Sequence, residues 1–420
     1  MGRTVDESAG PSAAACLSHP WTAGLTDDIV PSVMTEPSPC LPRTGVPPIP
    51  EARSWAAAYG GQAGPVIDLT QAVPGYPPHP GLLAHLAAAA ATTEAAAYGE
   101  ITGDAALRAA LAADMRRLYG TPVRDSDLAI TAGCNLAFVM AAMVAAGPGE
   151  AVLLPCPWYF NHAMALQMRG VEPRPLPCRP EDGFVPDPER AASLIDARVR
   201  AIALISPNNP TGAIYPAETI ARFYALCRAR GLWLILDETY RDFLPDATAP
   251  HALFADPDWG QTLVDLYSFS KAYCVPGHRV GAVAAGQGFR AQLAKVLDTL
   301  QICPPRAAQM ALAWAVPALG GWREGNRAIM AERARAFRTA LAAAPAWRID
   351  ALGGYFSYLR LPEEAPDAGE TARRLAAERG LLLLPGPFFG PGQERYLRVA
   401  FANAETSAIR AIPGRFAPAE

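Results

Sequence analysis

A lysine, two serines and an arginine follow one apolar run of the sequence. Residues 262–268 end in Ser268, Ser270 and Lys271 come directly after it, and Arg279 lies a little further along. A lysine at the end of a buried strand is costly to keep charged, so its pKa should fall, and a neutral amine attacks carbonyl groups. Serine hydroxyls and an arginine guanidinium bind phosphate. This segment therefore predicts a site for a ligand that carries an aldehyde and a phosphate.

Further polar residues follow the neighbouring apolar runs. Asn209 follows one run, and Asp237 and Tyr240 follow the next. Ligands of open α/β sheets bind beyond the carboxyl ends of the strands, so we expect these side chains to lie near Lys271. Taken singly they have plainer interpretations, because Asp237 and Glu238 could be solvated or capping acids and Asn209 could belong to an ordinary turn.

A second anion site is predicted where a strand runs into a helix. The segment Thr-Ala-Gly-Cys-Asn at residues 131–135 contains Gly133, Cys134 and Asn135. Backbone N–H groups at the start of a helix, together with the helix dipole, favour a phosphate there. We therefore expect these residues to contribute to the same ligand site.

Short apolar runs alternate with helical patterns through the first two thirds of the chain. The apolar runs are residues 66–69, 128–131, 151–155, 201–206, 232–237, 262–268 and 280–285, and the helical patterns lie at 80–94, 104–119 and 216–230 and begin near Asn135 and Asn161. This alternation predicts an α/β fold, in which a mainly parallel sheet is covered by helices on both faces.

The chain is expected to divide into three parts. Residues 1–62 would be an N-terminal arm and lead-in, in which 1–45 is either mobile or an overlong start with Met34 as the initiator. Residues 63–303 would form a large α/β domain. Residues 304–420 would form a small α/β domain, together with part of the N-terminal segment, because three long helical patterns (304–318, 321–343 and 366–378) alternate there with apolar runs.

The composition narrows the classes of function. Hydrophobic residues make up 51% of the 420 residues, charged residues 18%, and the formal net charge is −4, which argues against disorder and against a nucleic-acid partner. No apolar run approaches the roughly 20 residues of a membrane span, and the first residues lack a signal-peptide pattern. The eight cysteines lack metal-site spacing. We therefore expect a cytoplasmic protein without a membrane partner or a metal.

In their order and spacing, the motifs resemble those of the class I and II aminotransferases. These are the aspartate aminotransferase-like enzymes of fold type I, which use pyridoxal 5′-phosphate (PLP). The resemblance extends from Ile67 to Phe401 and depends on Ser-Phe-Ser-Lys followed by Gly-His-Arg, together with Asn-Asn-Pro-Thr-Gly and Asp-Glu-Thr-Tyr. It implies a large PLP-binding domain with a mainly parallel sheet and a smaller C-terminal α/β domain.

The resemblance also implies a role for each motif residue. Lys271 would form an imine with PLP, the internal aldimine, and would move the proton between Cα of the substrate and C4′ of the cofactor. Asp237 would pair with the pyridinium nitrogen. Tyr240 and Asn209 would hydrogen-bond the phenolic oxygen, and Asn209 would also lie beside the substrate. The phosphate would be bound by Ser268, Ser270, Arg279 and the backbone of Gly133, Cys134 and Asn135.

Four further positions match residues of the family. Tyr159 matches the aromatic residue that stacks on the cofactor ring, with Trp158 as the alternative. Tyr98 matches a tyrosine that reaches the phosphate in the partner subunit, so the resemblance implies a homodimer. Arg398 matches the arginine that binds the α-carboxylate of the substrate. Ala72 stands where the family usually has a glycine close to that carboxylate.

Other polar residues are assigned differently. We interpret His162 and His278 as structural histidines rather than acid–base groups. Dicarboxylate-specific members of the family carry an arginine in the region that corresponds to 298–306, and no clear match to it is found here. If Asp298 occupies that place, a cationic or neutral substrate side chain would be preferred over aspartate.

The sequence thus predicts an aminotransferase that moves an amino group from an L-amino acid to a 2-oxo acid in two half-reactions. One alternative is another PLP chemistry on the same fold, such as that of a β-lyase, a decarboxylase or an oxidase. Another is a non-catalytic, ligand-binding regulator, although residues 1–62 contain neither a helix–turn–helix pattern nor a basic cluster. Neither the amino donor nor the oxo acid can be named from the sequence.

Overall fold

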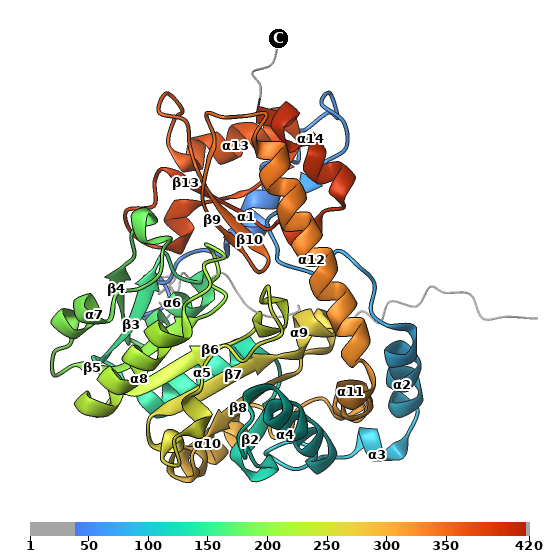
Figure 1. Ribbon diagram of the computed structural model, residues 1–420, viewed down its shortest axis with the longest axis vertical. Coiled ribbons are helices and arrows are strands. Elements are labelled where there is room, and N and C mark those ends of the chain that lie inside the picture. The colour runs from blue at the N-terminus through green and yellow to red at the C-terminus, as the bar shows by residue number, and fades with distance from the viewer. Residues whose placement is uncertain (1–37, 417–420) are drawn as a thin grey trace, which may run out of the picture. The chain divides into compact units, whose positions relative to one another are not determined.

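A seven-stranded sheet forms the centre of the protein, in a computed structural model that describes residues 38–416 (Figure 1). In spatial order its strands are β2 (Leu128–Thr131), β8 (Gly281–Ala285), β7 (Leu263–Ser268), β6 (Trp233–Asp237), β5 (Val199–Ile205), β3 (Ala151–Cys156) and β4 (Glu172–Pro177). Strand β8 runs antiparallel to both of its neighbours, and the other pairs are parallel. The predicted, mainly parallel sheet is confirmed.

Helices cover both faces of this sheet. Successive residues of each strand point to opposite faces, so in β6 Leu234 and Leu236 pack into one apolar core and Ile235 packs into the other. The first core is closed by α4 (Ala105–Tyr119), α7 (Pro188–Leu194), α8 (Ala217–Arg230) and α11 (Arg306–Ala318), and the second by α5 (Cys134–Ala145), α6 (Phe160–Gln167) and α10 (Gln287–Leu300). The expected helical layers on both faces are thereby confirmed.

The C-terminal third builds a second, antiparallel sheet. Its strands, in spatial order, are β12 (Leu384–Pro385), β13 (Tyr396–Val399), β10 (Phe356–Arg360) and β9 (Arg348–Gly353). Three helices pack against it: α12 (Gly320–Leu341), α13 (Ala368–Arg379) and α14 (Thr406–Phe416). Figure 1 shows these elements in orange and red, above the central sheet. Phe337, Leu359 and Leu397 lie in a core of their own, separate from the two cores of the large sheet.

Segments from the two ends of the chain lie side by side. Strand β1 (Ile67–Asp68) pairs in parallel with β11 (Leu381–Leu382), and the short helix α1 (Pro48–Ser54) packs against α13 and β12. Helix α11 packs against α2 (Pro80–Ala90) and α4, with α3 (Thr93–Ala96) beside it. From Cys40 onwards the chain forms one compact unit, so the division at residue 303 stays a prediction.

One prediction concerns the N-terminal arm, and another concerns membrane-spanning segments. Met34 and most of the expected N-terminal arm lie outside the described residues, as do residues 417–420. Within residues 38–416, no helix combines the length and the apolar character needed to cross a membrane.

Candidate active site

A cavity of about 530 Å³ opens at the carboxyl ends of β5, β6 and β7. Its volume lies within the roughly 300–1,000 Å³ of small-molecule sites. All of the predicted site residues except Gly133 and Tyr98 line it: Ala72, Cys134, Asn135, Tyr159, Asn209, Asp237, Tyr240, Ser268, Ser270, Lys271, Arg279 and Arg398. The structure therefore brings together side chains as far apart in the sequence as Ala72 and Arg398.

The lysine of this cavity is held in a form suited to nucleophilic attack. Lys271 lies in the short helix α9 (Phe269–Ala272), which follows β7 directly. Its Nζ donates a hydrogen bond to the backbone carbonyl of Ala72. Burial, reinforced by the positive charges of Arg279 and Arg398, lowers the pKa of the Lys271 amine to about 8. A substantial fraction of the amine is thus neutral close to physiological pH.

Asp237 ends β6 with its carboxylate fixed by three neighbours. Oδ1 accepts the backbone N–H of Thr239 at 2.9 Å and lies 3.7 Å from the Cys134 thiol. Oδ2 lies 3.3 Å from Nε2 of His162, whose ring stacks on Phe138 at a centroid distance of 3.6 Å. Asp237 is therefore neither solvated nor a simple helix cap. A buried, immobilised carboxylate of this kind suits a cationic partner in the cavity.

The same cavity contains a cradle for an anion. Helix α5 begins at Cys134, directly after Gly133, so its first backbone N–H groups face the cavity end of β2. A Cβ atom on Gly133 would lie 2.1 Å from an Nη atom of Arg279, so a larger residue would displace the guanidinium from this position. Arg279 forms no ion pair with any carboxylate of residues 38–416. Its charge is available to an incoming anion.

The serines complete this cradle. Oγ of Ser268 accepts the backbone N–H of Ser270 at 3.3 Å, which places the two side chains at the start of the same helical turn, next to Lys271. The hydroxyls, the α5 N-terminus and the guanidinium are the donors that a phosphate group requires. A phosphate-bearing aldehyde therefore fits the residues that are present.

Arg398 forms a second cationic site on the other side of the cavity. It lies in β13 and is 1% exposed, and burial lowers the pKa of its guanidinium to about 10. One Nη donates to Oδ1 of Asn209 at 3.0 Å and the other to the carbonyl of Thr70, whereas Nε has no hydrogen-bond partner within residues 38–416. An orphaned, buried N–H is costly, and a carboxylate would satisfy it.

Two aromatic residues complete the interior. Tyr240 is buried and packs against Tyr355 and Phe356, and burial raises the pKa of its hydroxyl well above the usual value. Tyr159 lines the cavity, and its hydroxyl accepts a hydrogen bond from Asn161 at 2.8 Å. Trp158 does not line this cavity. The geometry therefore favours Tyr159 as the residue that could stack on a bound ring.

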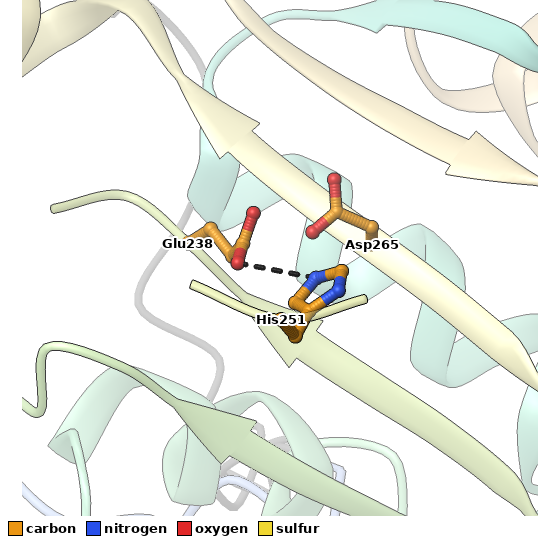
Figure 2. A group of neighbouring side chains, drawn as sticks. All are labelled: Glu238, His251 and Asp265. Atoms are coloured by element: carbon orange, nitrogen blue, oxygen red, sulfur yellow. Dashed lines mark ion pairs between the residues drawn. The ribbon is translucent and has the colours of Figure 1, made fainter. Parts of the chain in front are cut away.

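Glu238 lies on the other face of the sheet, in a buried cluster with His251 and Asp265 (Figure 2). Nε2 of His251 lies 3.3 Å from Oε1 of Glu238, and its Nδ1 accepts the backbone N–H of Leu253 at 3.1 Å. With Nδ1 accepting, the ring proton belongs on Nε2, so His251 faces Glu238 as a donor and not as a metal ligand. We interpret the cluster as an ion-pair network.

A guanidinium and a phenol complete this network. Arg241 lies 3.4 Å from Glu238, whose carboxylate also accepts the hydroxyl of Tyr119. Although burial opposes ionisation, His251 and Arg241 hold the pKa of the Glu238 carboxyl below its usual range. Burial and the nearby Glu238 charge raise the pKa of Asp265 well above its usual range. The interpretation of Glu238 as a solvated acid was wrong, since it is 1% exposed.

The two predicted residues outside the cavity lining differ in position. Gly133 adjoins the cavity through its contact with Arg279. Tyr98, by contrast, is 80% exposed and lines a separate cavity with Gly99, Arg306 and Met310. Within one chain, therefore, the structure does not bring Tyr98 to Lys271.

Several lining residues were not predicted from the sequence. They are Ile49, Gln71, Val73, Phe160, Asn161, Ile205, Thr239, Pro276 and Gly277. Thr239 lies inside the Asp-Glu-Thr-Tyr motif, so its position could have been inferred. Gly277 likewise belongs to the Gly-His-Arg motif. The others carry no pattern of type or spacing that marks them before the chain is folded.

A nucleophilic amine, a buried carboxylate and an anion cradle at the ends of the central strands, with Arg398 in β13 beside them, suit an α/β enzyme that binds a phosphorylated carbonyl cofactor and a carboxylate substrate. The family model for aminotransferase class I and II matches residues 61–415. The chain therefore belongs to the class I and II aminotransferases, as the motifs predicted. Members of this family use PLP, and the protein is a PLP-dependent aminotransferase of fold type I.

Individual relatives agree with this assignment. An aromatic aminotransferase from Arabidopsis thaliana is 30% identical over 327 residues, which cover 76% of this chain and 80% of the relative. An arginine–pyruvate transaminase from Pseudomonas aeruginosa is 31% identical over 309 residues, which cover 72% of this chain and 77% of the relative. The fold is similar to that of aspartate aminotransferase from Thermus thermophilus with maleate, with a TM-score of 0.83 and 24% identity. The superposition covers 91% of this chain and 99% of that structure.

Proposed function

We propose that this aminotransferase performs its chemistry at Lys271, and moves an amino group from an L-amino acid to a 2-oxo acid in two half-reactions. The observation that carries the proposal is the placement of Lys271, Asp237 and Arg398 around one cavity. Lysine supplies a partly neutral amine, aspartate a fixed negative charge and arginine a carboxylate site. These are the three groups that amino transfer from an α-amino acid requires.

The residues that would hold PLP follow from the donors present. Ser268, Ser270, Arg279 and the first N–H groups of α5 would bind the phosphate. Asp237 would pair with the ring nitrogen, Tyr159 would lie on the ring face, and Tyr240 and Asn209 would bind the phenolic oxygen. When bound, PLP supplies an aldehyde for covalent attachment and a conjugated ring that accepts the electrons released at Cα.

The chain's own groups would then bind the substrate and move a proton. Arg398 holds the α-carboxylate through its guanidinium, with Asn209 and the backbone of Ala72 beside it. The Lys271 Nζ would remove the proton from Cα of the substrate and would return it at C4′ of the cofactor. Asp237, immobilised by Thr239 and His162, would keep the ring nitrogen protonated.

We also propose that the enzyme is a cytoplasmic homodimer in which Tyr98 reaches the phosphate of the partner's site. The exposure of Tyr98 supports this, because a large aromatic side chain on the surface is suited to an interface. The free thiols among the described residues suit a reducing compartment. The division into domains at residues 63–303 and 304–420 belongs to the same proposal, with β1 joining the smaller part through β11.

The test is a single half-reaction. The PLP-loaded enzyme is mixed with an amino acid but no oxo acid, and cofactor and products are measured by mass spectrometry. We expect stoichiometric pyridoxamine phosphate and the matching oxo acid, and we expect the Lys271→Ala protein to form neither at a comparable rate. Ammonia, carbon dioxide or hydrogen peroxide as the main product would instead identify a lyase, a decarboxylase or an oxidase.

A further inference from the structure

Among residues 38–416, the part of the cavity wall that remains after the reacting groups are assigned carries no charge. It consists of Ile49, Gln71, Val73, Phe160, Asn161, Ile205, Thr239, Pro276 and Gly277. The charged residues of the lining are Asp237, Lys271, Arg279 and Arg398. Each of them has a role toward the cofactor or the α-carboxylate, so none is left for the side chain of the substrate.

An apolar cluster forms the wall on the side of α1. Ile49 of α1 and Phe160 of α6 line the cavity and pack in one cluster with Phe389 and Leu384. This cluster adjoins the carboxylate site, since the guanidinium carbon of Arg398 lies 5.0 Å from the centre of the Phe389 ring. A substrate whose carboxylate lies on Arg398 therefore has apolar surface within reach of its side chain.

Arg53, a further cation close to the cavity, is paired with a carboxylate. Arg53, also on α1, donates from Nη2 to Oε1 of Gln71 at 3.2 Å, and Gln71 is at the cavity rim. However, Nε of Arg53 lies 3.0 Å from the carboxylate of Asp68, and Arg53 does not line the cavity. From the described part of the chain, this wall offers no unpaired guanidinium to a second carboxylate on the substrate and no free carboxylate to an ammonium group.

We infer that the preferred amino donor carries an uncharged, apolar side chain, aliphatic or aromatic, which packs against Ile49 and Phe160. A charged side chain would lose its hydration against this wall without gaining a partner, which disfavours both dicarboxylic and basic amino acids. This inference depends on the proposed function only in naming the donor. The wall itself should select carboxylates even when no amino group is present to react.

Binding of unreactive carboxylates to the PLP-loaded enzyme tests the wall directly. Isothermal calorimetry with 3-phenylpropionate, 4-methylpentanoate and glutarate gives three dissociation constants. We expect the two apolar acids to bind roughly tenfold or more tightly than glutarate. Equal affinities, a preference for glutarate, or no binding of the apolar acids would overturn the inference, as would a cation supplied to this wall by a partner subunit.

Two variants locate the effect. Ile49→Arg places a cation on the wall, and we expect it to weaken 3-phenylpropionate binding and strengthen glutarate binding. Ile329→Arg introduces the same change on α12, at a residue that is 36% exposed and outside the cavity. This control should leave the ratio of the dissociation constants of glutarate and 3-phenylpropionate as it is in the wild type. An unchanged ratio in Ile49→Arg, with a folded protein by circular dichroism, contradicts the assignment of this wall.

Half-reactions with phenylalanine, leucine, aspartate and lysine distinguish the proposed function from the inferred side-chain preference. Faster conversion of phenylalanine or leucine supports both. Faster conversion of aspartate or lysine leaves the proposed function intact and overturns the inferred side-chain preference. If no amino acid is converted while the apolar acids still bind best, the proposed function fails and the description of the wall stands.

Discussion

Asp237 and Glu238, adjacent in the chain, send their carboxylates to opposite faces of the central sheet. Asp237 meets Cys134 and His162 on the α5 side, whereas Glu238 meets Tyr119 and His251 on the α4 side. The alternation of side chains along an extended backbone produces this separation. Asp237 therefore belongs to the cavity and Glu238 to the buried core, and substitutions should separate a role in activity from a role in stability.

Replacing Asp237 by asparagine should remove activity without unfolding the protein. The amide keeps the shape but loses the negative charge opposite the ring nitrogen, so we expect kcat/KM to fall by roughly 10²–10³. The free energy of unfolding, measured in urea, should change by less than about 1 kcal/mol. Steady-state kinetics and urea denaturation check both parts, and a variant with near wild-type kcat/KM would contradict the role of Asp237.

Replacing Glu238 by glutamine should destabilise the fold and should not remove a group that acts in the cavity. It removes the closer of the two carboxylates beside the buried Arg241 and leaves Asp265 at 4.0 Å, so we expect the free energy of unfolding to fall by about 1–3 kcal/mol. Glu324→Gln is the matched control, because Glu324 is 65% exposed in its ion pair with Arg327 and should change stability by less than about 0.5 kcal/mol. Equal urea midpoints for the two variants would refute the network.

Gly133→Ala should weaken the binding of PLP. The new Cβ would displace the guanidinium of Arg279, and the loss of a charge-assisted contact to phosphate should raise the dissociation constant roughly tenfold or more. Gly149→Ala is the control, since it has nearly the same backbone angle (φ +84 against +88) and no atom within 4 Å of the added Cβ. Fluorescence titration of the apoenzymes should show weaker binding for Gly133→Ala alone.

The reactivity of Lys271 in the apoenzyme should depend on pH with a midpoint near 8. Trace labelling with an amine-specific reagent, followed by mass spectrometry of the Lys271 peptide, measures this midpoint. The pKa in the folded chain lies below the ordinary value of 10.5, so the unfolded chain binds more protons between these two values. The stability contribution of Lys271 should accordingly rise with pH from about 8 to 10.5, and a labelling midpoint near 10.5 would disprove the shift.

Tyr98 should act on the site of the other subunit. We expect Tyr98→Ala to lower the affinity for PLP while leaving the fold of each chain intact, since the side chain is 80% exposed. In mixed dimers of Tyr98→Ala and Lys271→Ala chains, one site combines an intact lysine with an intact tyrosine. Activity should therefore reappear when the two poorly active variants are refolded together. If mixing restores nothing, Tyr98 has no role across an interface.

The parts of the fold that could be predicted are those that local pattern determines. The run Leu-Ala-Ile-Thr matches β2 residue for residue, and the other predicted strands of the central sheet agree within about two residues. Strand β4 was missed because prolines alternate at positions 173, 175 and 177. The prolines cannot donate backbone hydrogen bonds, and they are tolerated here because β4 lies at the edge of the sheet, paired only with β3.

Some residues of the site could likewise be placed from the sequence pattern, and others could not. Asn209, Asp237 and Lys271 could be placed together because each follows a buried strand and the strand ends share one edge of the sheet. Ile49 and Phe160 could not, because their place in the wall depends on how α1 packs against α6 and the C-terminal segment. An isoleucine or phenylalanine in a sequence indicates burial, and only the folded chain shows that the surface it offers faces a ligand.

The hydrogen bond from Arg398 to the carbonyl of Thr70 spans 328 positions of the sequence. The carboxylate site is therefore complete only when two distant parts of the polypeptide have come together. Local unfolding around either Thr70 or Arg398 should abolish the capture of an amino acid before it disturbs the segment that carries the lysine.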